Sequence, residues 1–534
     1  MLVAALAFVL VAAVGSARRA EPPLPVPAAQ AVAIAAGAPE IHAQARAATS
    51  TSVDRVDDHL ERVTFLRHGV VTASAGVRDT GDVFQPFPVT GHQSYGAPVT
   101  HHTLAFAALT ALFLLAALRR PLRLVPALDA LALGAAVVPT VLLDHGRVGA
   151  GQGAGALLLL YLAARCVAIA VGPGAPPFAG RPLLAVSAAP RLPVLAAGAV
   201  AVVVAVVTTT STGSVDVAFA TMEGATKLLH GVLPYGHLPG DVVHGDTYGL
   251  PAYAAYVPAA LLWPVSTTWD ETTGALLMAA VLTLAGAWGI ARALGGDRAA
   301  GLLVGLAFPS VLLTASSGTN DVLIFAALAW ALVWCAHPRR STVLVTAAAL
   351  AKVAPLALVP LWVARYRGRA RLGAIGAAIA VGAAVLAALL ALGGLHGPSS
   401  MLDAMSFQLG RRSLSSVYGA LGLGALQPLA QGLAVATVLG GTTLLAFDDA
   451  AARDPRRLAA LCAAALALCQ LAANYWAPLY LMWLLPPAAV ALLGRSGEAP
   501  ADPFAGDGGR AACRPEGTPR DGVLPDAVHS TLEH

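Results

Sequence analysis

The feature that most constrains this chain is a succession of long apolar runs, each nearly free of charge. A helix that crosses a bilayer needs roughly 20 apolar residues, which the shorter runs reach only with their flanks. Charged residues make up 12% of the chain and hydrophobic ones 57%, too few polar side chains to cover a soluble fold. The sequence therefore predicts an all-α polytopic membrane protein with about 12–14 transmembrane helices. The runs lie at 103–118, 125–143, 153–172, 194–210, 272–292, 299–315, 322–336, 341–364, 372–393, 429–447, 457–473 and 477–493.

The composition also disfavours several other classes of protein. Disordered, fibrous and soluble nucleic-acid-binding chains carry more polar residues than this one, so no nucleic-acid partner is expected. The 5 cysteines form no CxxC pair, which leaves structural zinc and a disulfide framework unsupported. The bilayer itself is the partner that the composition predicts.

The pattern divides the chain into four parts. Residues 1–101 hold an N-terminal apolar segment, 2–14, and a polar region expected to be extramembrane and partly disordered. Residues 102–193 form an extension with three apolar runs, and 194–493 form the main membrane domain. Residues 494–534 are rich in Gly, Pro and Asp and are predicted to be a disordered cytoplasmic tail.

Arginine clusters fix the expected orientation, because basic residues gather on the cytoplasmic side of membrane proteins. All clusters fall on one side if 341–364 is a tight hairpin with Lys352 near its apex. The opposite face then carries two long external loops, 211–271 and 394–428. In the first loop, 251–265 is apolar but short and bounded by prolines, so we interpret it as an interfacial helix. The alternative is a short membrane crossing, which would move the later arginine clusters to the other side. The clusters are Arg119 to Arg123, Arg181 to Arg191, Arg292 to Arg298, Arg339 and Arg340, Arg365 to Arg371, and Arg453 to Arg457.

Asp216 follows the 194–210 run directly, at the mouth of a predicted membrane helix. A carboxylate that is partly desolvated there is well placed to act as a general base. The alternative is an N-cap of an interfacial helix, a role that Ser214 or Asp216 could fill.

The rest of the first external loop concentrates polar groups, among them His244 and Tyr248. His230, His237 and His244 recur every seven residues, but prolines and glycines interrupt any helix that would carry them. A metal site is therefore the weaker interpretation, and solvated histidines are the alternative.

Asp321 and Lys352 are the ionisable residues that stand out at the ends of later apolar runs. An Asp at the edge of a membrane segment is a functional candidate and commonly pairs with a cation. Lys352, one of only two lysines in the chain, is the expected partner. Pairing with Asp321 and binding of a substrate phosphate are not exclusive roles.

The last external loop contains His396, Arg411 and Arg412. Two external arginines run against the positive-inside trend, and paired guanidinium groups suit a phosphate or pyrophosphate. The alternatives are a solvated loop or contacts with anionic lipid headgroups.

Taken in order and spacing, these residues resemble the GT-C superfamily. The closest likeness is to the bacterial membrane glycosyltransferases of the actinobacterial α-mannosyltransferase type, which use polyprenol-phosphate mannose. The likeness covers roughly 194–493. Its loose motifs are Asp216 to Gly236, Tyr248 to Pro264, Ser317-Gly-Thr-Asn-Asp321, Ala-Lys352-Val-Ala-Pro355, Arg411 to Tyr418 and Tyr480-Leu-Met-Trp-Leu-Leu-Pro486.

The resemblance implies a GT-C-like fold with two interfacial helices in the first external loop, matching 216–231 and 251–265. It implies that Asp216 is the catalytic base, and that Asp321 and Lys352 match an acidic and a basic residue near the donor. Arg411 and Arg412 would lie near the lipid phosphate, with His244, Tyr248 and His396 as further candidate substrate contacts. Tyr-Gly-Leu-Pro at 248–251 departs from the more usual Tyr-Pro-Pro, and 1–193 is an addition.

The implied function is an inverting transfer of a hexosyl group, expected to be mannosyl, from a polyprenyl-phosphate sugar to a cell-envelope glycolipid or glycan acceptor. The reaction would take place at the extracytoplasmic face of the plasma membrane. It requires no bound cofactor, no metal ligands are identified, and a divalent cation is an option in such enzymes. Two alternatives are a transporter or flippase of lipid-linked sugars, and a non-catalytic protein of envelope assembly. Transporters usually contain internal repeats and charges near the middle of the membrane.

Overall fold

The computed structural model of the chain describes residues 24–56, 59–89, 96–118, 124–172, 191–239, 245–265, 272–410 and 415–494. The apolar segment 2–14, the tail after Gly494, and the candidates His244, Arg411 and Arg412 lie outside these ranges. The arginine clusters at 119–123 and 181–190 lie outside them as well.

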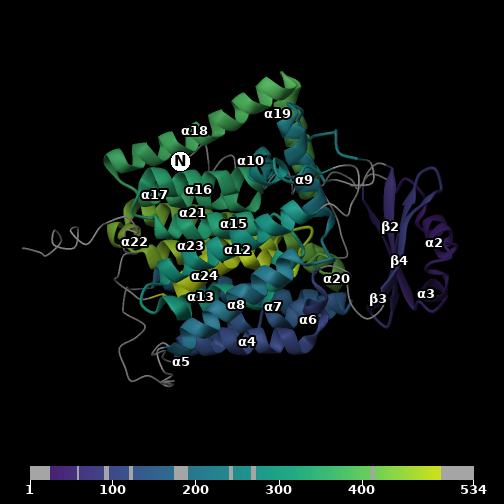
Figure 1. The fold of residues 1–534 in the computed structure, drawn as a ribbon, viewed down its shortest axis with the longest axis horizontal. Coiled ribbons are helices and arrows are strands. Elements are labelled where there is room, and N and C mark those ends of the chain that lie inside the picture. Colours follow the sequence, from purple (N-terminus) through teal and green to yellow (C-terminus); the bar gives the residue numbers. More distant parts are fainter. Residues whose placement is uncertain are drawn as a thin grey trace, which may run out of the picture. The chain divides into compact units, whose positions relative to one another are not determined.

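The described part of the N-terminal region contains helices and a β-sheet, so the chain is mostly helical, as expected, but not all-α. It contains α2 (Ala28–Ala36), α3 (His42–Arg46), β1 (Ser50–Arg55), β2 (Leu60–Arg67), β3 (Val70–Arg78) and β4 (Val83–Pro88). The strands form one antiparallel sheet in the order β1-β2-β3-β4. Figure 1 shows this sheet with α2 and α3 beside it. Alternate residues of β2 and β3, among them Val63, Phe65 and Ala75, pack on the helices in a separate apolar core.

Glu61 of β2 is a polar residue inside this domain core. Its side chain is fully buried, and its Oε1 accepts a hydrogen bond of 2.7 Å from the backbone N–H of Val26. Burial raises the pKa of the Glu61 carboxyl, and the Val26 bond opposes that shift. The segment before α2 is thereby attached to the sheet.

The rest of the described chain is helical, as the apolar runs predict. Its N-terminal part contains η1 (Pro98–His101), α4 (Thr103–Leu118), α5 (Leu124–Gly134), α6 (Val137–Asp144), α7 (Val148–Val171) and α8 (Arg191–Thr209). The segment 211–271 holds α9 (Asp216–Leu229), α10 (Leu250–Ala254) and α11 (Val257–Ala260). Then follow α12 (Thr273–Leu294), α13 (Arg298–Leu306), α14 (Pro309–Ser316), α15 (Asp321–Val333), α16 (Pro338–Ala351), η2 (Ala354–Ala357), α17 (Leu358–Arg365) and α18 (Gly368–Gly393). The last group is α19 (His396–Gly410), α20 (Val417–Leu421), η3 (Gly424–Leu426), α21 (Gln427–Phe447), α22 (Asp449–Arg453), α23 (Pro455–Leu471), η4 (Pro478–Tyr480) and α24 (Leu481–Leu493).

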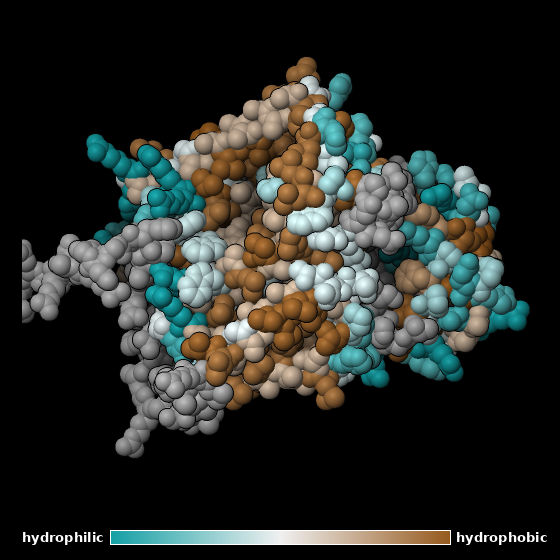
Figure 2. Space-filling view, viewed as in Figure 1, coloured by the Kyte–Doolittle hydropathy of each residue, from teal (hydrophilic) through white to brown (hydrophobic). Residues whose placement is uncertain are grey.

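Several of these helices could cross a membrane. Within the described residues, 5 are long and apolar enough, or 6 if the pair α13 and α14, bent by 60°, is one span. Five shorter apolar helices of 10–17 residues accompany them. Brown apolar residues cover the middle of the helical part in Figure 2, and teal hydrophilic residues border it on both sides. A multi-pass membrane protein fits these observations.

Within the part of the chain that the structure describes, long apolar helices are fewer than the expected 12–14. Two of the predicted runs are broken helices: 299–315 bends before Pro309, and 341–364 is interrupted at Lys352. Proline lacks the N–H that would continue a helix, so a run that is apolar throughout can still divide into shorter helices. Apolar length alone does not distinguish a straight span from such a pair.

The run 341–364 is a hairpin, as predicted. The Tyr366 hydroxyl donates a 2.8 Å hydrogen bond to the Cys335 carbonyl and lies 2.8 Å from the Ser341 hydroxyl oxygen. The beginning of α16 and the end of α17 are therefore neighbours, and Lys352 lies at the opposite end, between α16 and η2.

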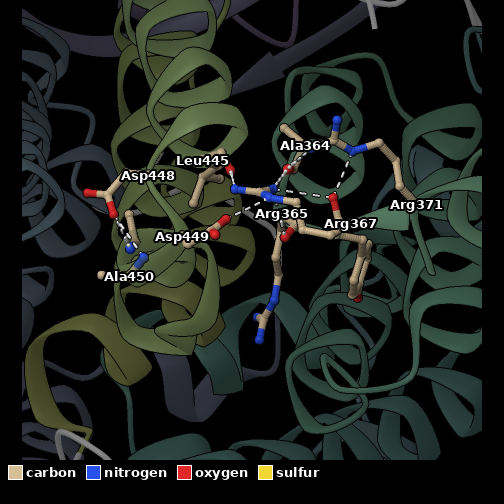
Figure 3. A network of polar contacts seen from close by, with 10 residues as sticks. Ala364, Arg365, Arg367, Arg371, Leu445, Asp448, Asp449 and Ala450 are labelled. Atoms are coloured by element: carbon tan, nitrogen blue, oxygen red, sulfur yellow. Dashed lines mark hydrogen bonds and ion pairs between the residues drawn. The ribbon is translucent and has the colours of Figure 1, made fainter. Parts of the chain in front are cut away.

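Arg367 and Arg371 lie at one end of the helical bundle, together with the ends of α17 and α21. Arg367 donates to Asp449 at 2.8 Å and to the carbonyls of Leu445 and Ala364 at 2.8 Å each (Figure 3). Arg371 donates to the Ala364 carbonyl at 3.0 Å. Guanidinium groups thus satisfy carbonyls at the ends of α17 and α21, where helices leave acceptors unpaired. Both arginines belong to one end of the bundle.

The N-terminal extension packs into this bundle. Helix α7 lies along α23, and α8 lies against α12 and α13. Inside it, Asp129 of α5 is fully buried and accepts hydrogen bonds from Tyr161 at 2.8 Å and Arg165 at 3.0 Å. The main apolar core includes residues of both parts.

Candidate functional site

The end of the bundle opposite the arginines brings together loops that are far apart in the sequence. The backbone N–H of Val215 donates to the Ser317 carbonyl at 3.0 Å, and that of Gly249 donates to the Ala351 carbonyl at 3.0 Å. These bonds join the beginning of α9 to the segment before α15, and the loop before α10 to the hairpin apex. The predicted residues Asp216, Tyr248, Asp321 and Lys352 belong to these segments.

Asp321 and Lys352 form the ion pair that the sequence predicts. Asp321 is the first residue of α15 and is only 2% exposed, and its Oδ1 accepts from the Lys352 ammonium group. Trp483 of α24 donates its indole N–H to the same oxygen at 2.8 Å. The carboxylate therefore has two donors in place of water, as a buried charge requires.

Aromatic rings surround the Lys352 ammonium group. The rings of Tyr248, Trp483 and Tyr480 have their centroids 5.0, 5.1 and 5.7 Å from its Nζ. Tyr480 and Trp483 also stack on each other, with centroids 4.5 Å apart. Ring faces attract a cation, so this arrangement holds a positive charge that is largely withdrawn from water.

Tyr248 is held by its neighbours on both sides. Its carbonyl accepts a 3.0 Å hydrogen bond from the Tyr235 hydroxyl. The next residue, Gly249, approaches the hairpin so closely that a Cβ there would lie 1.6 Å from the Leu350 carbonyl oxygen. Glycine is therefore required at 249 for the ring of Tyr248 to contact Lys352.

The electrostatics of Tyr248 connect Asp216 with the ion pair. Burial raises the pKa of the Tyr248 phenol, and the negative charges of Asp216 and Asp321 raise it further. Both carboxylates thus act on one hydroxyl, which stays protonated and can donate a hydrogen bond.

Asp216 is exposed, unlike Asp321, so it does not show the partial desolvation expected from the sequence. It is the first residue of α9, and its Oδ1 accepts from the N–H of Val217 at 2.9 Å. The N-cap position is Val215, without a side-chain cap, and the Ser214 hydroxyl lies 2.9 Å from that of Thr272. Ser214 therefore does not cap α9. Asp216 accepts a hydrogen bond from one N–H in the first turn of α9, and its negative charge lies at the positive end of the helix dipole.

The segments 216–231 and 251–265 are helical, as expected, although 251–265 forms two short helices. Both α10 and α11 pack against α9. Tyr256 and Ala259 share a small apolar core with Phe219 of α9. Neither helix is long enough to cross a membrane.

His396 is an exposed residue at the beginning of α19. The hydroxyls of Ser399 and Ser400 donate to its carbonyl at 3.0 and 2.8 Å. Among the described residues, no hydrogen bond, ion pair or ring contact links His396 to Asp321 or Lys352.

Trp483 and Tyr480 contact the ion pair of Asp321 and Lys352, and the sequence did not predict this from its charged residues. Both belong to the motif Tyr480-Leu-Met-Trp-Leu-Leu-Pro486, and a spacing of three places them on one helical face. That spacing, combined with the lone lysine, was the available signal.

Within the described ranges, no group of three or more His, Cys, Asp or Glu side chains is arranged to hold a metal ion. Comparisons with family models, with curated proteins and with solved structures give no match.

Proposed function

We propose that the protein is a membrane glycosyltransferase that inverts the anomeric carbon. Its donor would be a polyprenyl-phosphate sugar, expected to be mannose, and its acceptor a glycolipid or glycan of the cell envelope. The proposal includes a GT-C-like arrangement of 194–493, with the site on the extracytoplasmic side of the plasma membrane.

The observation that carries the proposal is that the loops at one end of the bundle hold one exposed and one buried carboxylate. Asp216 is exposed at the head of α9, whereas Asp321 is buried and bound to Lys352. An exposed carboxylate can meet an incoming hydroxyl, while a buried and paired one can only orient its neighbours. The two residues therefore suit different roles.

The chemistry follows from these positions. The acceptor hydroxyl oxygen attacks the anomeric carbon, its proton passes to the Asp216 carboxylate, and the bond from that carbon to the phosphate oxygen breaks. Polyprenyl phosphate leaves with the electron pair of that bond. Proton removal by a positioned base typically accelerates such a step by about 10²–10⁴-fold.

Lys352 has a second task in this scheme. The Lys352 ammonium group has three N–H donors, and its bond to Asp321 uses only part of them. Its positive charge can attract the donor phosphate, with the aromatic rings around it excluding water. Sugar faces also pack well on aromatic rings, which suits Tyr248 beside the lysine.

The test is Asp216→Asn, assayed in membranes supplied with radiolabelled polyprenyl-phosphate mannose. We expect transfer of label to endogenous acceptors to fall by about 10²-fold or more, with unchanged yield of folded protein. Asp449→Asn is the matched control, because Asp449 is also the first residue of a helix but belongs to the arginine end. Wild-type transfer by Asp216→Asn would refute the base assignment. A separate experiment, glycolipid profiling of a deletion strain, would identify the acceptor.

A further inference from the structure

Helix α7, in the extension before residue 194, contacts two loops of the main membrane domain. Gln152, in its second turn, has no exposed surface. Its Nε2 donates to the carbonyl of Ser415 at 2.9 Å and to that of Trp476 at 3.1 Å. One side chain of the extension thus joins two loops of the main membrane domain.

The same helix also makes a close contact with the ring of Trp476. A Cβ at Gly155 would lie 2.6 Å from ring atoms of Trp476, whose side chain is almost fully buried. Gly155 therefore allows the ring to lie directly on the α7 backbone. Gln152 fixes the backbone of Trp476, and Gly155 fixes its ring.

A short chain of contacts leads from Trp476 toward the aromatic rings around Lys352. The indole N–H of Trp476 donates to Gln470 Oε1 at 3.1 Å, and Gln470 Nε2 donates to the Tyr480 carbonyl at 2.9 Å. Gln470 is itself only 2% exposed.

The last contacts of the chain reach the ion pair. Tyr480 stacks on Trp483, and Trp483 donates to Asp321. Every contact in this series joins buried or partly buried groups. A shift of Trp476 would therefore displace the next group, because the groups contact one another directly.

We propose that Gln152 is a positioning residue and that α7 sets the place of Trp476 and, through it, of the rings and the carboxylate around Lys352. The consequence for substrate binding rests on the proposed glycosyltransferase function. The extension would then be part of the support of the site, which explains why it packs into the bundle.

The first test measures steady-state kinetics with purified full-length protein and polyprenyl-phosphate mannose. Gln152→Leu keeps the size of the side chain but removes both donors. We expect the KM for the donor to rise about five- to tenfold with little change in kcat, because Asp216 is held by separate contacts. Gly155→Ala, which displaces the Trp476 ring, should change KM in the same direction.

Gln431→Leu, in the partly buried face of α21, is the matched control and should leave KM within about twofold. A purely structural role of Gln152 would lower the yield of folded protein and leave KM unchanged. An unchanged KM in both Gln152→Leu and Gly155→Ala would overturn the proposal.

A second measurement does not depend on the reaction. A Ser415→Cys thiol is labelled with a membrane-impermeant maleimide, and labelling of the native cysteines is subtracted. Adding Gln152→Leu should raise the labelling rate by about fivefold, whereas adding Gln431→Leu should not. An equal rate with and without Gln152→Leu would overturn the positioning role even if no sugar transfer is found. Absence of sugar transfer by the wild-type protein would instead refute the proposed function.

Discussion

Lys352 shows how much one residue can indicate in a chain that is poor in charge. A lysine in an apolar run requires a counter-charge, and Asp321 is the acid at the matching end of a neighbouring run. The pairing could be predicted because few other partners exist. The aromatic rings around the ammonium group could not, because Tyr248 and Tyr480 come from segments on either side of this pair in the sequence, more than 200 residues apart.

The energetics of this pair lead to a prediction at the residue scale. Asp321→Asn or Lys352→Met alone leaves one buried charge without its partner and should destabilise the protein by about 3 kcal/mol. The double variant removes both charges and should regain most of that loss. Thermal unfolding of the detergent-purified protein measures the three variants.

The control for this prediction is the exposed pair of Arg367 and Asp449, with side chains 38% and 65% exposed. Asp449→Asn should lower stability by less than about 1 kcal/mol, since solvent screens such pairs. A double variant of Asp321 and Lys352 as unstable as either single variant would contradict the view that unpaired charge is the main cost.

At the scale of elements, the hairpin of α16 and α17 positions the site by its apex. Its apolar length and the arginines at both ends predict the reversal, because a single span would separate Arg339 from Arg365. The close approach of the 248–249 backbone to that apex could not be predicted. The local sequence around Lys352 does not indicate which loop packs on the hairpin apex.

A glycine substitution tests this contact. Gly249→Ala would put a methyl group against the Leu350 carbonyl oxygen, so we expect the loop to move and Tyr248 to leave Lys352. The variant should unfold at a lower temperature and lose transfer activity. Gly376→Ala in α18 is the matched control, because no atom lies within 4 Å of its Cβ position.

Replacing a mid-helix glycine by alanine stabilises a helix by roughly 0.5–1 kcal/mol, so Gly376→Ala should keep or raise the unfolding temperature. Equal unfolding temperatures and equal activities for the two alanine variants would disprove the requirement for glycine at 249.

The N-terminal sheet is the element that sequence reasoning missed. Its core-facing residues in β3 are Ala73, Ala75 and Val77, which give only a weak alternation of hydrophobicity. The turn from β2 to β3 uses His68 and Gly69, both with positive φ, where hairpins more often have Asn-Gly or Asp-Gly. Because the strand residues are small and the turn residues are unusual for a hairpin, the local sequence does not distinguish this strand from a loop.

At the scale of the whole molecule, the helical part has two polar ends with different compositions. One end carries the arginines that satisfy helix carbonyls, and the other carries Asp216 and the Asp321–Lys352 pair. The contacts of Tyr366 with the beginning of α16 place Arg340 and Arg369 at the same end. Basic residues favour the cytoplasm, so the candidate site is expected to be extracytoplasmic.

Cysteine labelling in intact cells tests this orientation. Arg340→Cys and Arg369→Cys should both be protected from a membrane-impermeant maleimide, and Ser399→Cys in α19 should react with it. The hairpin would be refuted if Arg340→Cys and Arg369→Cys were labelled from opposite sides. Reaction of both with protection of Ser399→Cys would reverse the proposed sidedness.

The sequence alone determined the membrane class, the hairpin and the pairing of one of its two lysines with an acid. Charge in an apolar chain is costly, and few positions can accommodate it. The tertiary structure decided which aromatic rings surround Lys352, how α7 reaches Trp476, and that the region before the membrane helices contains a sheet. These features depend on contacts between segments distant in the sequence. Such contacts are set by how helices and loops fill space together, which no local pattern of residues records.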